Sequence, residues 1–449
     1  MSPDTSARSV VDRLRAMTPQ QRTAAVRTLA QRGLLATIDT PPVRLPEPAD
    51  TLTRKQSVLW QLDHDGRHGD FYHCGALWFA PSCSARALAD AFQAVAGGFD
   101  ALTRVVDVRD GRPRSGPAPV PTPVPVPVPA GVPDPARWVR RDAAAVASGP
   151  LDPTRSAAQV RAYDLPDGSG ALAVVGHDIH LDHQGLVEVL GPALAAHLTG
   201  APPVREEVGI GDVAAWQQRR LDDGVLGAAV EGRRCALRGA PVCPWPTGGD
   251  RAGRRVEVLS GARAAEPLRA AAARAGVSPA TLAFVAWYRA LAAWDPRAGA
   301  VPIGCCTTMR LRPELRTTLG NLTNTVVVLP GRQWPTLAGP RLVDEAHQAM
   351  KEALGSVDLP FELVFGDGAV ADERIGVRFT FVESAPAGEP QPLRAEAVRF
   401  AYAKSVLSCE AQVGEDGGLR VWLDHRPAQI GAQDADRLAA LLRAELRNL

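Results

Sequence analysis

The sequence predicts a mixed α/β (α+β) protein built from two similar lobes. The chain has 449 residues, and a single hydrophobic core usually stops growing below this length, so two lobes are expected. In both halves, short stretches rich in β-forming residues alternate with segments whose apolar residues recur at helical spacing. This alternation favours helices packed on sheets.

The chain begins with a predicted helical hairpin over residues 6–35, where apolar side chains recur at helical spacing in two runs. Thr18 and Pro19 lie between the runs and indicate the start of the second helix, because threonine caps helices and proline suits the first helical position. Residues 40–50 contain four prolines and predict an extended connector, because the residue before a proline disfavours helix.

The next elements in order are a helix near residues 57–62, a strand at 72–79 and an amphipathic helix at 85–96. Residues 112–135 carry alternating prolines, which suit polyproline II and exclude a regular helix or a central strand, so we expect a surface excursion between two strands. A short apolar run at 172–175 then predicts a strand, and residues 186–198 predict a helix.

The second half continues the alternation. Ser278 and Pro279 give a cap and a first helical position for one of its helices. The predicted helices are 213–221, 266–275, 279–294 and 434–446, and the predicted strands are 256–259, 301–306, 323–329, 377–382, 406–413 and 419–423. We expect Trp216, Trp287 and Trp294, which fall within helical patterns, to be packing anchors.

Composition excludes several classes of protein. The formal net charge is +1, so no global field would draw the chain to nucleic acid or to an anionic membrane. The sequence has no signal peptide and no apolar run of about 18 residues, and we expect a soluble cytoplasmic protein. Seven scattered cysteines argue against a disulfide framework or a zinc finger. No phosphate-binding glycine loop and no GxSxG elbow is present.

A polar cluster at residues 177–183 is the candidate reaction centre. His177, Asp178, His180, Asp182 and His183 follow a predicted strand and precede a predicted helix. Such strand-to-helix turns are where side chains converge on a cavity. Three histidines with two aspartates also suit zinc, but a three-residue spacing on a strand or turn directs side chains apart, so we expect no metal.

Six segments, in the right order, resemble conserved motifs of the condensation domains of nonribosomal peptide synthetases, which share a fold with chloramphenicol acetyltransferase-like acyltransferases. Each match is weak alone, but together they run from about Leu52 to the C-terminus. The segments are residues 52–62 (family pattern SxAQxRLWxL), 177–183 (HHxxxDG), 212–217 (YxDYAxWQ), 303–315 (VIGxxxxGRxxPEL), 319–325 (IGxFVNT) and 377–381 (VMFVLQN).

The resemblance implies two chloramphenicol acetyltransferase-like lobes that form a V, with the active site in a tunnel between them. We expect a helical lead-in at residues 1–45, an N-terminal lobe at 46–205 and a C-terminal lobe at 206–449. The implied function is that of a free-standing acyltransferase in antibiotic or other natural-product biosynthesis. It would transfer an acyl or aminoacyl group to an amine or hydroxyl acceptor. This group arrives as a thioester on an acyl or peptidyl carrier protein that is a separate chain. No cofactor of its own is implied, since phosphopantetheine arrives on the carrier.

The resemblance also assigns roles to single residues. His177 matches the first motif histidine, whereas Asp178 stands where the family has its second, mechanistically central histidine. Asp182 matches a structural aspartate that pairs with an arginine, here Arg310. Asn324 is expected to line the tunnel, with a satisfied polar core residue as the alternative.

The loss of the second histidine leaves several chemistries open. A solvated carboxylate is a poor proton acceptor at neutral pH, so Asp178 would act as a base only in a buried setting, or would bind the acceptor's ammonium group. His180 and His183 are the other candidate bases, because imidazole titrates near neutral pH. The alternative interpretation of His180 is that it packs or forms a hydrogen bond in the turn. An altered motif also fits a binding module that recruits a tailoring enzyme or carrier protein, or a domain that catalyses cyclisation.

Overall fold

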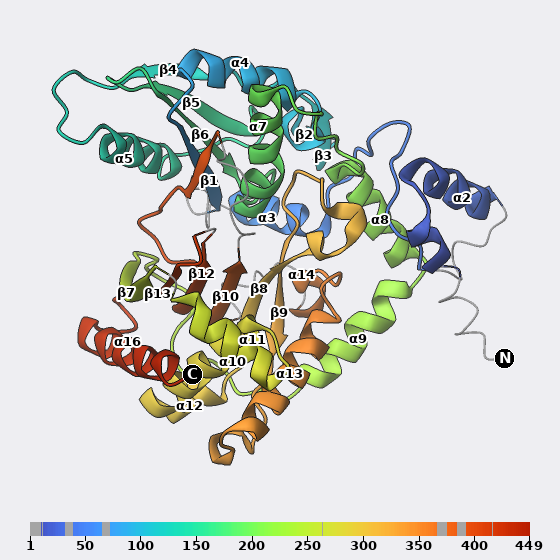
Figure 1. Ribbon diagram of the computed structural model, residues 1–449. Coiled ribbons are helices and arrows are strands. Elements are labelled where there is room, and N and C mark those ends of the chain that lie inside the picture. The colour runs from blue at the N-terminus through green and yellow to red at the C-terminus, as the bar shows by residue number, and fades with distance from the viewer. Residues whose placement is uncertain are drawn as a thin grey trace. The chain divides into compact units, whose positions relative to one another are not determined.

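A five-stranded and a six-stranded β-sheet organise the chain, one in each of two units (Figure 1). The computed structural model describes residues 10, 12–31, 39–64, 72–262, 264–365, 375–383, 392–414 and 416–449. The first unit comprises Met1–Val230, Met309–Leu322 and Gln391–Arg399, and the second comprises Glu231–Thr308, Thr323–Pro390 and Phe400–Leu449. Each unit combines its sheet with helices, as the alternation in the sequence predicts.

The sheet of the first unit has the strand order β11-β1-β6-β5-β4. Its centre is the antiparallel pair β1 (His73–Ala80) and β6 (Gly170–His177), whose residues are all buried. Strands β11 (Arg394–Ala397) and β5 (Ala158–Asp164) flank this pair. Helices α4 (Ala85–Ala96) and α5 (Pro135–Ala147) pack on the sheet, and α7 (Gly191–Thr199) packs on α4. The buried central pair gives the polar cluster after β6 a rigid support.

The proline-rich excursion contains more regular structure than the sequence analysis expects. Strands β2 (Arg104–Arg109) and β3 (Arg112–Pro117) form a hairpin whose turn residues, Asp110 and Gly111, have φ angles of 52° and 72°. Strand β4 (Val124–Pro127) pairs with β5 at the sheet edge. Its prolines are tolerated there because an edge strand does not need every backbone N–H for pairing.

The N-terminal elements of the first unit agree with the predictions in outline. Helix α2 (Pro19–Gln31) begins after Thr18, whose hydroxyl accepts a hydrogen bond from Gln21 N. Residues 12–16 are also helical, and the rest of the predicted hairpin, at 6–9, 11 and 32–35, lies outside the described residues. The connector at 40–50 contains no helix or strand, and α3 (Arg54–His64) follows it.

Helix α8 (Ile210–Asp222) belongs to the first unit, although the sequence analysis places it at the start of a C-terminal lobe. Trp216 explains this placement, because it is 2% exposed, and its indole N–H donates to the carbonyl of Thr40 at 2.7 Å. Arg220 and Arg312 also lie over its ring. The predicted anchoring role of Trp216 is confirmed by these contacts.

The sheet of the second unit has the order β7-β13-β12-β10-β8-β9. Strand β10 (Val377–Glu383) runs parallel to its neighbours β12 (Leu407–Val413) and β8 (Ile303–Thr308). The other pairs are antiparallel, and they involve β7 (Arg254–Gly261), β13 (Leu419–His425) and β9 (Thr323–Val328). All six strands fall on or next to stretches that the sequence predicts.

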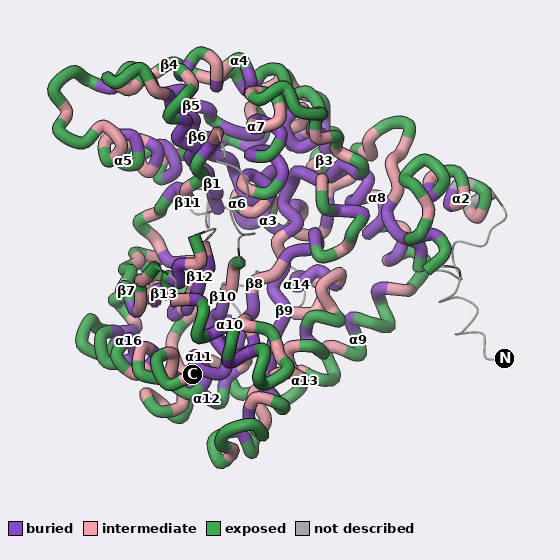
Figure 2. Tube along the Cα trace, viewed as in Figure 1, coloured by how far each residue is buried: buried purple, intermediate pink, exposed green. Residues whose placement is uncertain are grey.

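Helix α11 (Pro279–Trp294) is the most deeply buried helix of this unit, as its purple trace in Figure 2 shows. Trp287 and Phe284 on α11 are fully buried, and Phe284 packs edge to face on Phe379 of β10. The other helices of the unit include α10 (Ala265–Ala275), α12 (Pro296–Ala300), α13 (Pro340–Leu354), α14 (Phe361–Phe365) and α16 (Ala432–Arg447), and α9 (Val225–Leu237) leads into it. No helix in the described part of the chain is both long and apolar enough to cross a membrane.

Candidate functional site

The polar cluster forms a tight turn between the end of β6 and the short helix α6 (His183–Gly185), as the sequence predicts. The backbone N–H groups of His180 and Leu181 donate to the carbonyl of His177 at 2.9 and 3.2 Å. Gly176 is required just before the turn, because a Cβ there would lie 2.6 Å from Leu181 Cδ1. These backbone hydrogen bonds and the close contact at Gly176 therefore restrict the backbone conformation of the turn.

Asp182 and Arg310 form the ion pair that the family resemblance implies. Arg310 Nη1 donates to both carboxylate oxygens, at 3.0 and 2.9 Å, and the two side chains are 3% and 4% exposed. Asp182 also accepts from the backbone N–H groups of Gly185 and Leu322, at 2.5 and 2.8 Å. Burial would raise the pKa of Asp182, but Arg310 and these amides together hold it below its usual value.

The segment that carries Arg310 makes a further hydrogen bond to the turn, through Asn321. Arg310 donates to the carbonyls of Thr318 and Gly320, at 3.1 and 2.8 Å, which fixes this segment around the guanidinium. Asn321 Nδ2 then donates to the backbone carbonyl of Asp178 at 2.5 Å. Asn321 lies inside the matched segment 319–325, but the pattern of that segment does not predict this contact.

Asp178 is held firmly at the centre of the turn. Its backbone N–H donates to the carbonyl of Tyr72 at 2.7 Å, and its own carbonyl accepts from Asn321. The residue is 7% exposed. Because both backbone groups are fixed, the point from which the carboxylate projects is fixed as well.

His177 is buried and serves the turn with one ring nitrogen. Its Nδ1 accepts from the backbone N–H of Ile179 at 3.0 Å, so the neutral ring carries its proton on Nε2. Nε2 lies 3.8 Å from Asp63 Oδ1 at the end of α3. The ring of His73 packs against it edge to face, with centroids 5.6 Å apart. With 1% exposure, His177 has little access to a substrate.

His180 is buried too, with 4% exposure. Its Nε2 donates to the carbonyl of Pro153 at 2.9 Å. Burial lowers the pKa of His180 to about 4, against the hydrogen bond to Pro153, which raises it. The ring is therefore neutral near pH 7 and anchors the turn to the segment before β5.

His183 differs from the other two histidines because it is exposed. Its Nδ1 lies 3.0 Å from the backbone carbonyl of Gly75 on β1, and since a carbonyl only accepts, Nδ1 carries the proton. Nε2 of the neutral ring then keeps its lone pair. A carbonyl that fixes the tautomer in this way is a common means of orienting a histidine base or ligand.

The three imidazoles of the turn are thus directed to separate partners, at Ile179, Pro153 and Gly75. Among the described residues, no three histidine, cysteine or acidic side chains gather in a way that could hold a metal ion. The expectation of no metal at the turn stays a prediction.

Asn324 in β9 uses its whole amide group within the second unit. Nδ2 donates to the carbonyls of Val357 and Leu359, at 2.8 and 2.7 Å. Oδ1 accepts from the backbone N–H groups of Thr325 and Phe361, at 2.9 and 3.3 Å. The side chain is 6% exposed. This geometry fits the alternative of a satisfied polar core residue, and a tunnel-lining role stays a prediction.

The overall architecture matches solved condensation domains. The first condensation domain of the calcium-dependent antibiotic synthetase, in complex with a substrate analogue, superposes with a TM-score of 0.72 at 17% identity, over 90% of this chain and 96% of that chain. The X-domain from teicoplanin biosynthesis, solved in complex with OxyB, superposes with a TM-score of 0.68 at 21% identity, over 90% of this chain and 94% of that chain. The chain therefore has the mixed α/β fold of condensation domains, as the ordered motifs predict.

The sequence comparisons add one relative. No family model matches the chain. The phosphinothricin tripeptide synthetase PhsC of Streptomyces viridochromogenes is 31% identical over 194 residues. The match covers 42% of this chain and 18% of the synthetase, so the chain spans a small part of the relative it matches.

Proposed function

We propose that the chain is a condensation-type acyltransferase that uses His183 as its proton acceptor. It would join an acyl or aminoacyl group, carried as a thioester on a carrier protein, to an amine or a hydroxyl. The observation that carries the proposal is the state of His183, which is exposed, held in one tautomer by the carbonyl of Gly75, and left with a lone pair on Nε2.

In the proposed reaction, the acceptor nitrogen attacks the thioester carbonyl carbon. The C–N bond forms, the C–S bond breaks, and the proton lost by the nitrogen passes to Nε2 of His183. The histidine then returns this proton to the departing thiolate, which leaves as the free thiol of the carrier's phosphopantetheine. Positioning of the two reactants supplies a large share of the rate enhancement in such reactions, and general base catalysis adds typically 10²- to 10⁴-fold.

Asp178 would hold the acceptor amine in this scheme. A carboxylate accepts hydrogen bonds from an amine or ammonium group, and charge-assisted bonds of this kind are the stronger ones. The hydrogen bonds of the Asp178 backbone N–H and carbonyl support such a role, because they fix the position from which the carboxylate would bind the amine. His177 and His180, which are buried and whose rings are bonded to the backbone of Ile179 and Pro153, would act as scaffold.

The direct test is intact-mass analysis of acyl-loaded carrier proteins incubated with the protein and a panel of amines. We expect loss of the acyl group from the carrier together with an amide product. His183→Ala and Asp178→Ala should each lower turnover by at least about tenfold while the fold is retained. His197→Ala is the matched control, because His197 is an exposed histidine on α7. Full activity of both site variants would refute the assignment.

A second candidate function is recruitment of a tailoring enzyme or a carrier protein. The likeness to the teicoplanin X-domain, which was solved in complex with OxyB, favours this alternative. In that case the chain should bind an oxygenase or a carrier saturably, and His183→Ala and Asp178→Ala should bind it as the wild type does. Product formation that depends on His183 would exclude recruitment as the main role.

A further inference from the structure

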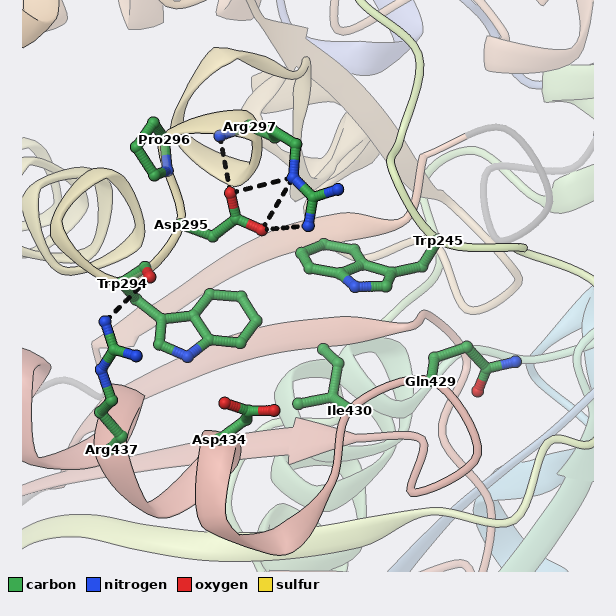
Figure 3. Close-up of a pocket in the computed structure, with 9 residues that line it drawn as sticks. All are labelled: Trp245, Trp294, Asp295, Pro296, Arg297, Gln429, Ile430, Asp434 and Arg437. Atoms are coloured by element: carbon green, nitrogen blue, oxygen red, sulfur yellow. Dashed lines mark hydrogen bonds and ion pairs between the residues drawn. The ribbon is translucent and has the colours of Figure 1, made fainter.

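The second unit contains a hollow of about 340 Å³ that the proposed reaction does not use. Figure 3 shows that it lies where the end of α11, the start of α12 and the first turns of α16 meet the loop that carries Trp245. Its lining residues are Trp245, Trp294, Asp295, Pro296, Arg297, Gln429, Ile430, Asp434 and Arg437.

Two tryptophans give the hollow an aromatic wall. The rings of Trp245 and Trp294 stack with centroids 5.6 Å apart and an interplanar angle of 29°. Both side chains are only partly buried, so indole surface remains open toward the hollow. Trp294, for which the helical pattern predicts an anchoring role, thus also lines the hollow.

The loop that carries Trp245 is fastened on both sides of the ring. Trp245 lies between Pro244 and Pro246, which restrict the backbone. Before it, the sulfur of Cys243 packs so closely on Gly376 that no side chain would fit there. After it, the carbonyl of Thr247 accepts from Nη1 of Arg426, a fully buried side chain, at 2.5 Å. The aromatic wall is thus preformed.

Among the residues that the structure describes, the lining carries one ion pair and two charged groups without a charged partner, Asp434 and Arg437. Arg297 donates to both carboxylate oxygens of Asp295, with Nη2 2.8 Å from Oδ2, so these two charges neutralise each other. Arg437 donates to the backbone carbonyl of Trp294 at 3.2 Å. Within the described part of the chain, the carboxylate of Asp434 has no hydrogen bond or ion pair. Figure 3 places it beside the ring of Trp294 and next to Ile430.

We propose that this hollow binds a small organic cation, with a substituted ammonium group against the indoles and near the carboxylate of Asp434. Indole is the aromatic ring that best attracts a cation over its face. The carboxylate of Asp434 favours positive charge on its side of the aromatic wall, while the guanidinium of Arg437 is directed to the backbone carbonyl of Trp294. The apolar part of the ligand would lie on Pro296, which is exposed. This site is independent of the chemistry at the turn after β6.

The test is calorimetric titration of the full chain with benzyltrimethylammonium, compared with benzyl alcohol, which has the same ring but no charge. We expect saturable binding of the cation at one site and much weaker binding of the alcohol. Asp434→Asn and Trp245→Leu should each weaken cation binding about fivefold or more. Raising the salt concentration should weaken it as well, because the site is partly exposed.

Asp436→Asn is the matched control, because Asp436 is an exposed acid on the same turn of α16 that does not line the hollow. It should bind the cation as the wild type does. Asp434→Asn changes one exposed side chain, so it tests the site even if Trp245→Leu misfolds. Equal affinity for the cation and the alcohol, unchanged affinity in Asp434→Asn, or no saturable binding to the wild type would each overturn the proposal.

Discussion

Replacing Asp182 with asparagine removes one charge from the buried ion pair and keeps the shape of the side chain. The carboxylate accepts hydrogen bonds from Arg310 Nη1, at 3.0 and 2.9 Å, and from the backbone amides of Gly185 and Leu322, at 2.5 and 2.8 Å. Asparagine offers one acceptor oxygen where the carboxylate offers two, so an amide N–H would lose its partner and the guanidinium would be left buried and unpaired.

The expected loss of stability follows from this burial. Breaking a buried ion pair from one side costs about 3 to 5 kcal/mol, and a typical domain has a free energy of unfolding of about 5 to 15 kcal/mol. Asp182→Asn should therefore remove a large part of the stability of the first unit. An exposed pair should matter far less, and Asp107 with Arg109, whose side chains are 41% and 54% exposed, is the internal comparison. Asp107→Asn should change stability by at most about 1 kcal/mol.

Urea unfolding at neutral pH measures both variants, and a double-mutant cycle isolates the pair. Arg310→Met should destabilise the chain by a similar amount to Asp182→Asn. The double variant should lose less than the sum of the two, because neither charge is then left unpaired in the interior. A loss below about 1 kcal/mol in Asp182→Asn, or strict additivity in the cycle, would refute the reasoning.

Three further predictions concern other buried polar groups. Burial raises the pKa of Glu206 from 4.5 to about 8. The folded chain then holds one proton more than the unfolded chain between these values, stability falls as the pH rises through the window, and Glu206→Gln should flatten the fall in urea titrations. Burial lowers the pKa of His180 from 6.5 to about 4. Stability should therefore fall by up to roughly 3 kcal/mol as the pH drops through that window, and His180→Gln, which keeps a donor for Pro153, should remove the loss. Asn324→Ala leaves two carbonyls and two backbone N–H groups without their side-chain partner and should cost about 2 to 4 kcal/mol in the same assay. Wild-type behaviour of any variant would contradict its prediction.

The sequence predicts much of the fold where a local signal is strong. Helices α4 and α11 coincide with the predicted 85–96 and 279–294, because each has a serine cap and a continuous apolar face. The hairpin of β2 and β3 was missed although Asp110 and Gly111 are a good signal for its turn. Helix α13 was missed despite burying Leu342, Ala346 and Ala353 on one face. An alanine-rich chain offers so many helical patterns that a true one is easily overlooked.

The position of the candidate site in the chain could be predicted, but which of its histidines is exposed and which are buried could not. The place of the turn after β6 follows from a local apolar run and a polar cluster. The exposure of each ring depends on partners that are distant in sequence, namely Pro153 for His180 and Gly75 for His183. Asn321, which holds Asp178, also comes from a remote segment. Periodicity carries no information about such pairings.

The geometry of the turn supports the proposal that His183 takes the place of the missing second histidine. Asp182 and Arg310 form the buried ion pair that joins the turn to the segment 309–322. His183 is exposed and has one fixed tautomer, and it stands at the last position of the segment 177–183, where the pattern HHxxxDG has glycine. A histidine five residues after Asp178 supplies an imidazole to the same turn, from the first residue of α6. The proposed transfer of the base from position 178 to His183 follows from this difference.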